Sequence, residues 1–318
     1  MVELPKISPK IHFYDKEKLE KINPETLKLW NKYKIDMSLR ELSDRTVSGY
    51  ENDISHWFIY VYDNQGNQCI TDLDEDDITE FLAFCKQGGN NSRRMKRRMA
   101  SISAFYKFLH KKRIIQESPM DFIDRPKKDV DILKQTFLTK EQVDLMRKKL
   151  DEKGDILLQT YAMFSLSTMA RVHAVANLKW EQIDFKNRIC NDVLEKEGKY
   201  VTLYFSEEVK DLLVKLRQYY VNNNIENNGY VFVNKNTGEP MTTSTFDAWC
   251  KVIGNMIGVP TLHAHDFRHS GSNLLRNAGM DLQDVSKLLH HQSTDVTVKF
   301  YLKEDSKKIQ ANKDKFEI

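Results

Sequence analysis

From Ser43 onward, apolar residues recur at the spacing of an amphipathic helix. They are Val47, Tyr50, Ile54, Trp57, Phe58 and Val61. At 3.6 residues per turn these positions fall on one face. The pattern stops at the turn-prone stretch Asp63-Asn64-Gln65-Gly66, which predicts the end of the helix.

Two further helices are predicted in the same part of the chain. One runs from Asp76 to Lys86, and the next begins at Ser92, its expected cap, after Gly88-Gly89-Asn90-Asn91. The buried stripe of that last helix is Met95, Met99, Ile102, Phe105 and Leu109. We therefore expect an α-helical domain over residues 37–117. Residues 1–36 show no clear periodicity and are interpreted as an N-terminal extension or arm.

The second half of the chain begins after a predicted linker. Residues 118–136 contain two prolines, mixed charges and little periodicity. Thr139 and Gln142 then form a predicted capping box that opens a helix. Segments 189–193 and 200–205 predict a hairpin around Glu197-Gly198, and 230–233 a third short strand. The expected fold is mainly α with a small antiparallel sheet in the second domain, residues 137–302.

Charge is separated into blocks that the net value of +3 conceals. Residues 72–80 carry six acids, whereas residues 91–113 carry nine Lys or Arg and no acid. This separation is typical of a face that binds a polyanion. The candidate DNA-binding residues are Arg93, Arg94, Lys96, Arg97 and Arg98. The alternative is a basic face that is only solvated.

Composition restricts the location of the protein and its metal chemistry. No run of about 18 apolar residues occurs, and the start lacks the apolar stretch of a secretory signal. We therefore expect a cytoplasmic protein without a membrane partner. The four cysteines form no CxxC pair, which argues against a thiolate zinc site and a disulfide framework. At 318 residues, two domains are expected.

Candidate catalytic residues occur in a fixed order near the end of the chain. His265 and Arg268 are three apart, so on a helix they project from one face and can converge on one anion. Leu288-Leu289-His290-His291 and then Tyr301 follow. Taken singly, each has an ordinary structural explanation, such as a capping histidine or a core tyrosine. The combination is more informative than any member.

A single arginine, Arg171, stands at the head of the otherwise apolar segment 166–180. An arginine in such surroundings is costly without an anionic partner. The chain resembles the tyrosine recombinase family over roughly residues 40–305. The resemblance rests on Arg171 with Leu178 and Trp180, the His265-x-x-Arg268 pair, Leu288-Leu289-x-His291 and Tyr301. The resemblance implies a two-domain DNA clamp that cuts and rejoins DNA through a covalent 3′-phosphotyrosine and a Holliday junction.

The resemblance also implies roles for individual residues. Arg171 and Arg268 would hold the non-bridging oxygens of the scissile phosphate. His265 would transfer a proton, His291 would donate a hydrogen bond to the phosphate, and Tyr301 would attack the phosphorus. No cofactor is expected, because the covalent link conserves the energy of the phosphodiester.

The family places a lysine on the hairpin as general acid. Lys196 and Lys199 both lie there, and Lys196 is preferred because it precedes the Gly198 turn. The choice between them stays open.

Three positions depart from the family pattern. The acidic residue usual three positions after the first arginine is Ala174, and two usual glycines are Met169 and His290. From His291 to Tyr301 is ten positions, one more than usual. His290 therefore competes with His291 for the same role.

The family resemblance supplies the expected partners. They are double-stranded DNA recombination sites, a homotetramer on DNA and an accessory DNA-bending or directionality protein. The tail, residues 303–318, is expected to dock on a neighbouring protomer, and the alternative is that it folds back on its own domain or stays disordered. Three alternative functions are a type IB topoisomerase, a metallohydrolase built on the five histidines between 263 and 291, and a DNA-binding regulator without catalysis.

Overall fold

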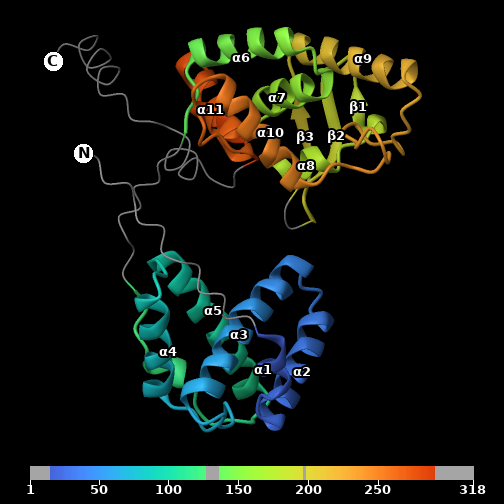
Figure 1. Ribbon diagram of the computed structural model, residues 1–318. Coiled ribbons are helices and arrows are strands. Elements are labelled where there is room, and N and C mark those ends of the chain that lie inside the picture. Colours follow the sequence, from blue (N-terminus) through green and yellow to red (C-terminus); the bar gives the residue numbers. More distant parts are fainter. Residues whose placement is uncertain (1–14, 127–135, 196–197, 291–318) are drawn as a thin grey trace, which may run out of the picture. The chain divides into compact units, whose positions relative to one another are not determined.

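The computed structural model describes residues 15–126, 136–195 and 198–290 in two compact units (Figure 1). The first unit comprises residues 1–132 and the second residues 133–318. Each unit has its own hydrophobic core. The boundary between the units lies within the linker predicted over residues 118–136. None of the described helices is long and apolar enough to cross a membrane.

The first unit is entirely helical in its described residues. Its elements are α1 Lys16–Glu20, α2 Pro24–Leu39, α3 Asp44–Asn64, α4 Glu75–Gln87, α5 Ser92–Lys111 and the 3₁₀ turn η1 Pro119–Phe122. Aromatic rings from α2, α3 and α5 fill the core, where Trp30 meets Phe105 edge to face at 5.4 Å and Phe58 at 6.1 Å. Such ring pairs stabilise a core beyond the burial of their area.

The arm predicted over residues 1–36 is wrong for its second half. Helix α2 places Leu29, Trp30, Tyr33 and Met37 in the core. The signals were present in the sequence, because these residues have helical spacing and Asn23 caps the helix ahead of Pro24 at its first position. The described part of the unit begins at Asp15, which caps α1.

The other helices of the first unit follow the predicted pattern closely. Helix α3 is capped by Ser43, and α4 begins one residue earlier than expected behind Asp74. The cap of α5 is Asn91, not Ser92, and its side chain accepts a hydrogen bond from the Arg94 amide. The predicted linker also starts too early, since Met120 of η1 packs into the core of the first unit.

The second unit is built around a buried central helix, α7. Its elements are α6 Lys140–Lys153, α7 Ile156–Thr168, α8 Val172–Ala176, η2 Trp180–Gln182, β1 Ile183–Asp184, β2 Ile189–Leu194, β3 Tyr200–Tyr204, α9 Glu207–Asn222, α10 Thr243–Met256, α11 Ala264–Asn277 and α12 Leu282–Leu288. Figure 1 shows α7 in the middle, with α6, α9 and α11 around it. Thr139 and Gln142 form the predicted capping box of α6.

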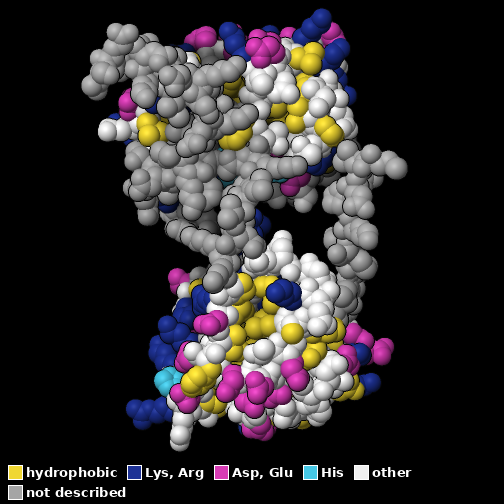
Figure 2. Space-filling view, turned by 90° about the vertical axis from the view of Figure 1, so that its left-hand side faces the viewer, with side chains coloured by type: hydrophobic (Ala, Val, Ile, Leu, Met, Phe, Trp, Pro, Cys, Tyr) yellow, Lys and Arg dark blue, Asp and Glu magenta, His cyan; other side chains and the backbone are white. Residues whose placement is uncertain are grey.

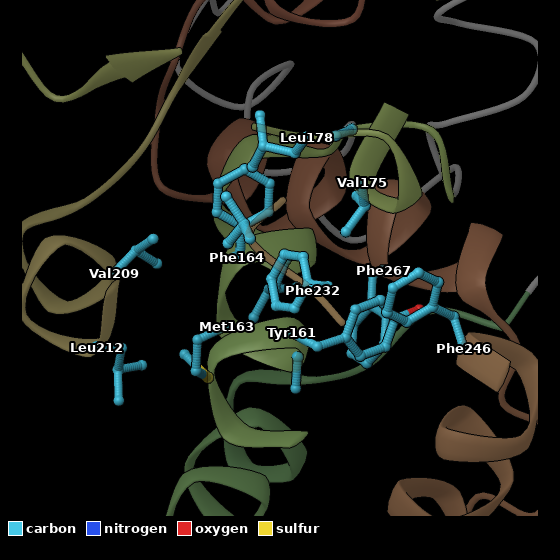
Figure 3. Close-up of a cluster of buried hydrophobic side chains, with 14 of the residues drawn as sticks. Tyr161, Met163, Phe164, Val175, Leu178, Val209, Leu212, Phe232, Phe246 and Phe267 are labelled. Atoms are coloured by element: carbon cyan, nitrogen blue, oxygen red, sulfur yellow. The ribbon is translucent and has the colours of Figure 1, made fainter. Parts of the chain in front are cut away.

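The core of the second unit contains large aromatic side chains from distant segments (Figure 3). Tyr161 of α7 stacks on Phe246 of α10 with ring centroids 4.4 Å apart. Phe267 of α11 meets the edge of Tyr161 at 6.0 Å. This packing fixes α11, which carries candidate catalytic residues, against α7.

The sheet is small and antiparallel, in the order β1-β2-β3. The predicted hairpin is confirmed as β2 and β3. The strand predicted over residues 230–233 is wrong: Tyr230 and Val233 form only isolated bridges, and the third strand is β1. Tyr220 donates a hydrogen bond to the Val231 carbonyl at 2.9 Å, and the Val231 amide donates to the Leu178 carbonyl at 2.9 Å, so both backbone groups of this buried residue are satisfied without a sheet.

Candidate active site

Two predicted arginines meet at one buried carboxylate. Arg171 is the cap residue of α8, and Arg268 lies on α11. Nη1 of Arg171 donates to Oε2 of Glu195, and Nη1 of Arg268 lies 3.8 Å from Oε1 of the same side chain. The second unit therefore brings together two guanidinium groups from distant segments.

Arg268 is held in place by backbone carbonyls. Its Nη1 donates to the Met169 carbonyl at 2.7 Å, and its Nη2 donates to the Leu289 carbonyl. The side chain is only 1% exposed. Because the guanidinium is planar and its donors have fixed directions, these bonds define its orientation.

The two departures from the family's glycines lie beside this arginine. Met169 has φ +54° and His290 has φ +51°, both in the left-handed region that glycine adopts at little cost. The Met169 carbonyl is an acceptor for Arg268, and His290 follows the other acceptor, Leu289. The unusual backbone is thus kept here with larger residues. The Met169 side chain packs with Val285 and Leu289.

His265 lies on the first turn of α11 and its ring centroid is 5.1 Å from that of His269. The pKa of His265 is lowered, first by loss of surrounding water and then by the positive charges of Arg268, His263 and Arg171. A lowered pKa keeps the imidazole neutral near pH 7. The neutral ring can accept a proton.

His290 belongs to the same cluster. Its Nε2 lies 3.0 Å from the Thr202 carbonyl, and its Nδ1 lies 3.9 Å from Oε2 of Glu195. Burial lowers its pKa, opposed by the hydrogen bond to Thr202 and reinforced by the charges of Arg268 and Arg171. Its position keeps it a candidate for the role shared with His291.

Three predicted catalytic residues, Lys196, His291 and Tyr301, lie outside the described residues. Lys199, the other hairpin lysine, is exposed, and its carbonyl accepts the Glu195 amide at 2.8 Å.

Glu195 is the site residue that sequence reasoning missed. The family's acidic position is Ala174, which is buried, and Glu195 lies 21 positions further along the chain. The hairpin contained a signal. Side chains alternate along a strand, so Glu195 shares a face with the apolar Val193. An acid on the buried face of a strand requires a cationic partner.

The basic helix of the first unit is partly occupied by internal ion pairs. Asp53 of α3 is fully buried, and its carboxylate lies 3.3 Å from Nη2 of Arg94 and 3.0 Å from Nε of Arg97. Both arginines keep part of their surface exposed. Arg93 is exposed and Lys96 is half-buried.

Arg98 requires a correction to the predicted DNA-binding set. It is only 4% exposed, donates to Oδ1 of Asn90 at 3.2 Å and lies over the Phe81 ring. Its guanidinium therefore packs inside the first unit instead of facing a phosphate.

A hollow between α3 and α5 adds to the basic face. It measures about 510 Å³ and is lined by Arg45, Arg94, Arg97 and Tyr50, among others. Cationic side chains around a concave surface suit a phosphate group. Figure 2 shows acidic and basic side chains gathering on different parts of the first unit.

The metal-site hypothesis finds no cluster to support it in residues 15–126, 136–195 and 198–290. No group of three or more His, Cys, Asp or Glu side chains there is arranged to hold an ion.

Two family models match the chain. The "Phage integrase family" model matches residues 136–308, and the "Phage integrase, N-terminal SAM-like domain" model matches residues 31–113. The second match includes most of α2, in agreement with the structure.

Among curated proteins, the chain is similar to two named recombinases. Tyrosine recombinase XerC of Pediococcus pentosaceus is 26% identical over 268 residues, covering 81% of this chain and 87% of the relative. Tyrosine recombinase XerD of Listeria monocytogenes is 26% identical over 268 residues, covering 81% and 88%.

Solved structures share the fold. The Tn1549 transposon integrase in complex with transposon right end DNA matches with a TM-score of 0.67 and 19% identity, covering 90% of this chain and 98% of that one. XerH bound to difH substrate matches with a TM-score of 0.66 and 17% identity, covering 95% and 93%. A lambda integrase dimer bound to a COC′ core site matches with a TM-score of 0.68 and 14% identity, covering 92% and 84%.

Proposed function

The chain belongs to the phage integrase family and is a tyrosine site-specific recombinase, and we propose that it cleaves and rejoins DNA through a covalent 3′-phosphotyrosine at Tyr301. The observation that carries the proposal is the convergence of Arg171 and Arg268 beside Glu195. Phosphoryl transfer concentrates negative charge on the non-bridging oxygens. Guanidinium groups, which stay protonated, stabilise that charge.

The remaining roles are those that the resemblance to the tyrosine recombinase family implies. The Tyr301 oxygen bonds to phosphorus while the bond to the 5′ oxygen breaks, and the 5′-hydroxyl leaves. Neutral His265 accepts the phenol proton, and Lys196 protonates the leaving oxygen. His291 or His290 donates a hydrogen bond to the phosphate. Rejoining reverses these steps with a 5′-hydroxyl from another strand, so no ATP is consumed.

DNA is the proposed partner of both units. The exposed members of the basic face on α5 would contact phosphates in the first unit, and the arginine cluster would contact the scissile phosphate in the second. Exchange between two sites, by way of a Holliday junction, requires four active tyrosines. We therefore propose a homotetramer on DNA, assisted by an accessory DNA-bending or directionality protein.

The alternatives are less well supported. A type IB topoisomerase-like activity is not favoured, because the curated relatives are named recombinases and the similar structures are integrase and recombinase complexes. A strict requirement of cleavage for Mg²⁺ or Zn²⁺ would support the metallohydrolase. DNA binding with no covalent product would support the regulator.

A covalent trapping experiment tests the proposal. Purified protein is incubated with sheared DNA from the source genome in the presence of EDTA, and fragments that become attached to protein are recovered and sequenced. A nicked duplex with the recovered site is then used to map the modified peptide. We expect attachment at Tyr301 and none in Tyr301→Phe. Undiminished attachment in that variant would refute the assignment.

A further inference from the structure

We propose that Glu195 is a positioning residue for both Arg171 and Arg268. It would take the place of the acidic residue that the family usually has at the position of Ala174. The inference rests on the proposed function. The Glu195 side chain is only 2% exposed and faces Arg171, Arg268 and His290. Within the described residues, its Oε1 has no hydrogen-bond partner, so the nearby charge of Arg268 is its compensation.

The need for such a residue arises on α8. Arg171 is the cap residue of this five-residue helix and makes no side-chain capping bond. Position 174 lies one turn later, but its side chain is a buried methyl group. A long arginine side chain loses considerable rotamer freedom when it is fixed. A carboxylate reaching it from another element can hold it in one orientation.

The hairpin fixes Glu195 for this purpose. Its amide donates to the Lys199 carbonyl at 2.8 Å, so the backbone is anchored just beyond the end of β2. A bulge between Cys190 and Val193, with Asp192 at φ +52°, determines on which face of the strand the following side chains lie. Val193 is buried, and Glu195 shares its face. Lys196 follows directly in sequence, so one hairpin supplies both the carboxylate and the candidate general acid.

A different role for the carboxylate is to occupy the phosphate position and block the site. The distribution of burial argues against it. Arg171 keeps 33% of its side chain exposed, whereas Glu195 keeps 2%. The carboxylate therefore approaches the guanidinium from the buried side and leaves surface on the solvent side.

The experiment compares Glu195→Gln, Glu195→Asp and Glu208→Gln in the full-length protein. Glu208 also accepts from an arginine, Arg147 at 2.9 Å, but this pair lies on the surface. We measure single-turnover adduct formation on a nicked duplex that the wild-type protein attacks, the affinity for an intact duplex of the same sequence, and the melting temperature.

We expect Glu195→Gln to slow adduct formation by roughly 10- to 100-fold, the loss typical of removing a group that orients a functional side chain. Its DNA affinity should be unchanged. Glu195→Asp should fall between Gln and wild type, and Glu208→Gln should match wild type. In an Arg171→Ala background, Glu195→Gln should cost much less, because the two residues act as a unit.

Three results would overturn the inference. Wild-type rates in Glu195→Gln would exclude positioning, and faster cleavage with tighter DNA binding would indicate a blocking role. A full additive loss in the Arg171→Ala background would indicate a purely structural role. If Glu195→Gln does not fold, a folded Glu195→Ala that cleaves at the wild-type rate would likewise contradict the inference. Absence of any wild-type adduct would instead refute the proposed function.

Discussion

Arg171 and Arg268 have different surroundings, so their removal should have different consequences. Either substitution by Ala should lower cleavage by about two to three orders of magnitude, the usual effect of removing one preorganised donor to a developing charge. Arg268→Ala should also lower the free energy of unfolding by about 3–5 kcal/mol, because it leaves buried partners uncompensated. Those partners are Glu195 and two carbonyls.

Single-turnover cleavage and urea unfolding check this difference. Arg171 is one-third exposed, so its substitution should destabilise less. DNA binding should survive in both variants. Normal cleavage by either variant would contradict a role of that arginine in binding the scissile phosphate. Equal decreases in the free energy of unfolding would contradict the inference from burial.

His290 provides a pH test, because its pKa in the folded protein is lowered. Its unfolded-state pKa is near 6.5. Below that pH the unfolded state binds more protons than the folded state, so the free energy of unfolding decreases as the pH is lowered. The contribution is fully present above pH 6.5 and is lost as pH falls through the lowered folded value.

We expect the free energy of unfolding to fall less steeply between pH 7.5 and 5.5 in His290→Asn than in wild type. Asn tolerates the left-handed backbone at this position. His110→Gln, on the exposed side of α5, is the control and should keep the wild-type slope. An identical slope in His290→Asn would refute a lowered pKa.

At the residue scale, the family resemblance implied a shared role for Arg171 and Arg268, but their carboxylate partner was missed for a physical reason. Spacing along one helix relates His265 to Arg268, but Arg171 and Glu195 are 24 positions apart and meet only in the folded second unit. Likewise, Met169 and His290 appeared only as departures from glycine. Their positive φ values show that the family's backbone is retained despite the side chains.

At the element scale, the basic residues of α5 divide into an exposed or half-buried set and the buried Arg98, although Arg94 and Arg97 also pair with the buried Asp53. Changing Arg93, Arg94, Lys96 and Arg97 to Gln should flatten the dependence of log affinity on log salt concentration, by roughly 0.9 for each phosphate that the variant no longer neutralises. These side chains are exposed or half-buried. Binding of a duplex is measured by anisotropy across a salt series. An unchanged slope would mean that the face is only solvated.

Arg98→Gln is the matched comparison on the same helix. Because Arg98 is buried against Asn90 and Phe81, we expect a lower melting temperature with an unchanged salt slope. A slope that falls as much as for an exposed arginine would contradict the packing role.

Periodicity predicted elements well where burial is one-sided and poorly where it is not. The helices α3, α4 and α5 and the hairpin have clear alternation or helical stripes. The run Val231, Phe232 and Val233 is buried on all sides, so a short apolar run does not distinguish a strand from a buried loop. Helix α2 was missed although its apolar spacing was present.

At the scale of the whole molecule, the sequence predicted two domains joined by a linker over residues 118–136, and the structure has two units, each with its own core. It did not predict that η1 belongs to the first unit. Met120 packs there, where η1 lies against α4 and α5, and such long-range packing leaves no periodic signal in a short segment rich in proline and charge.

The tail, residues 303–318, lies outside the described residues, and its docking stays a prediction. Ile309, Phe316 and Ile318 are apolar residues in a charged segment too short to form its own core. Such residues need a partner surface, and a neighbouring protomer in the proposed tetramer would offer one. If so, the tail would couple neighbouring active sites.

Truncation after Lys303 distinguishes docking in trans from folding back. If the tail docks in trans, binding of a single DNA site persists while synapsis and strand exchange fall together, because the link between protomers is removed. Native gels on one-site and two-site duplexes measure binding and synapsis, and a two-plasmid assay measures exchange. Ile309→Ser with Phe316→Ser in the full chain removes only the apolar side chains and should reproduce the defect. Wild-type tetramer and recombination levels after truncation would reject the coupling role.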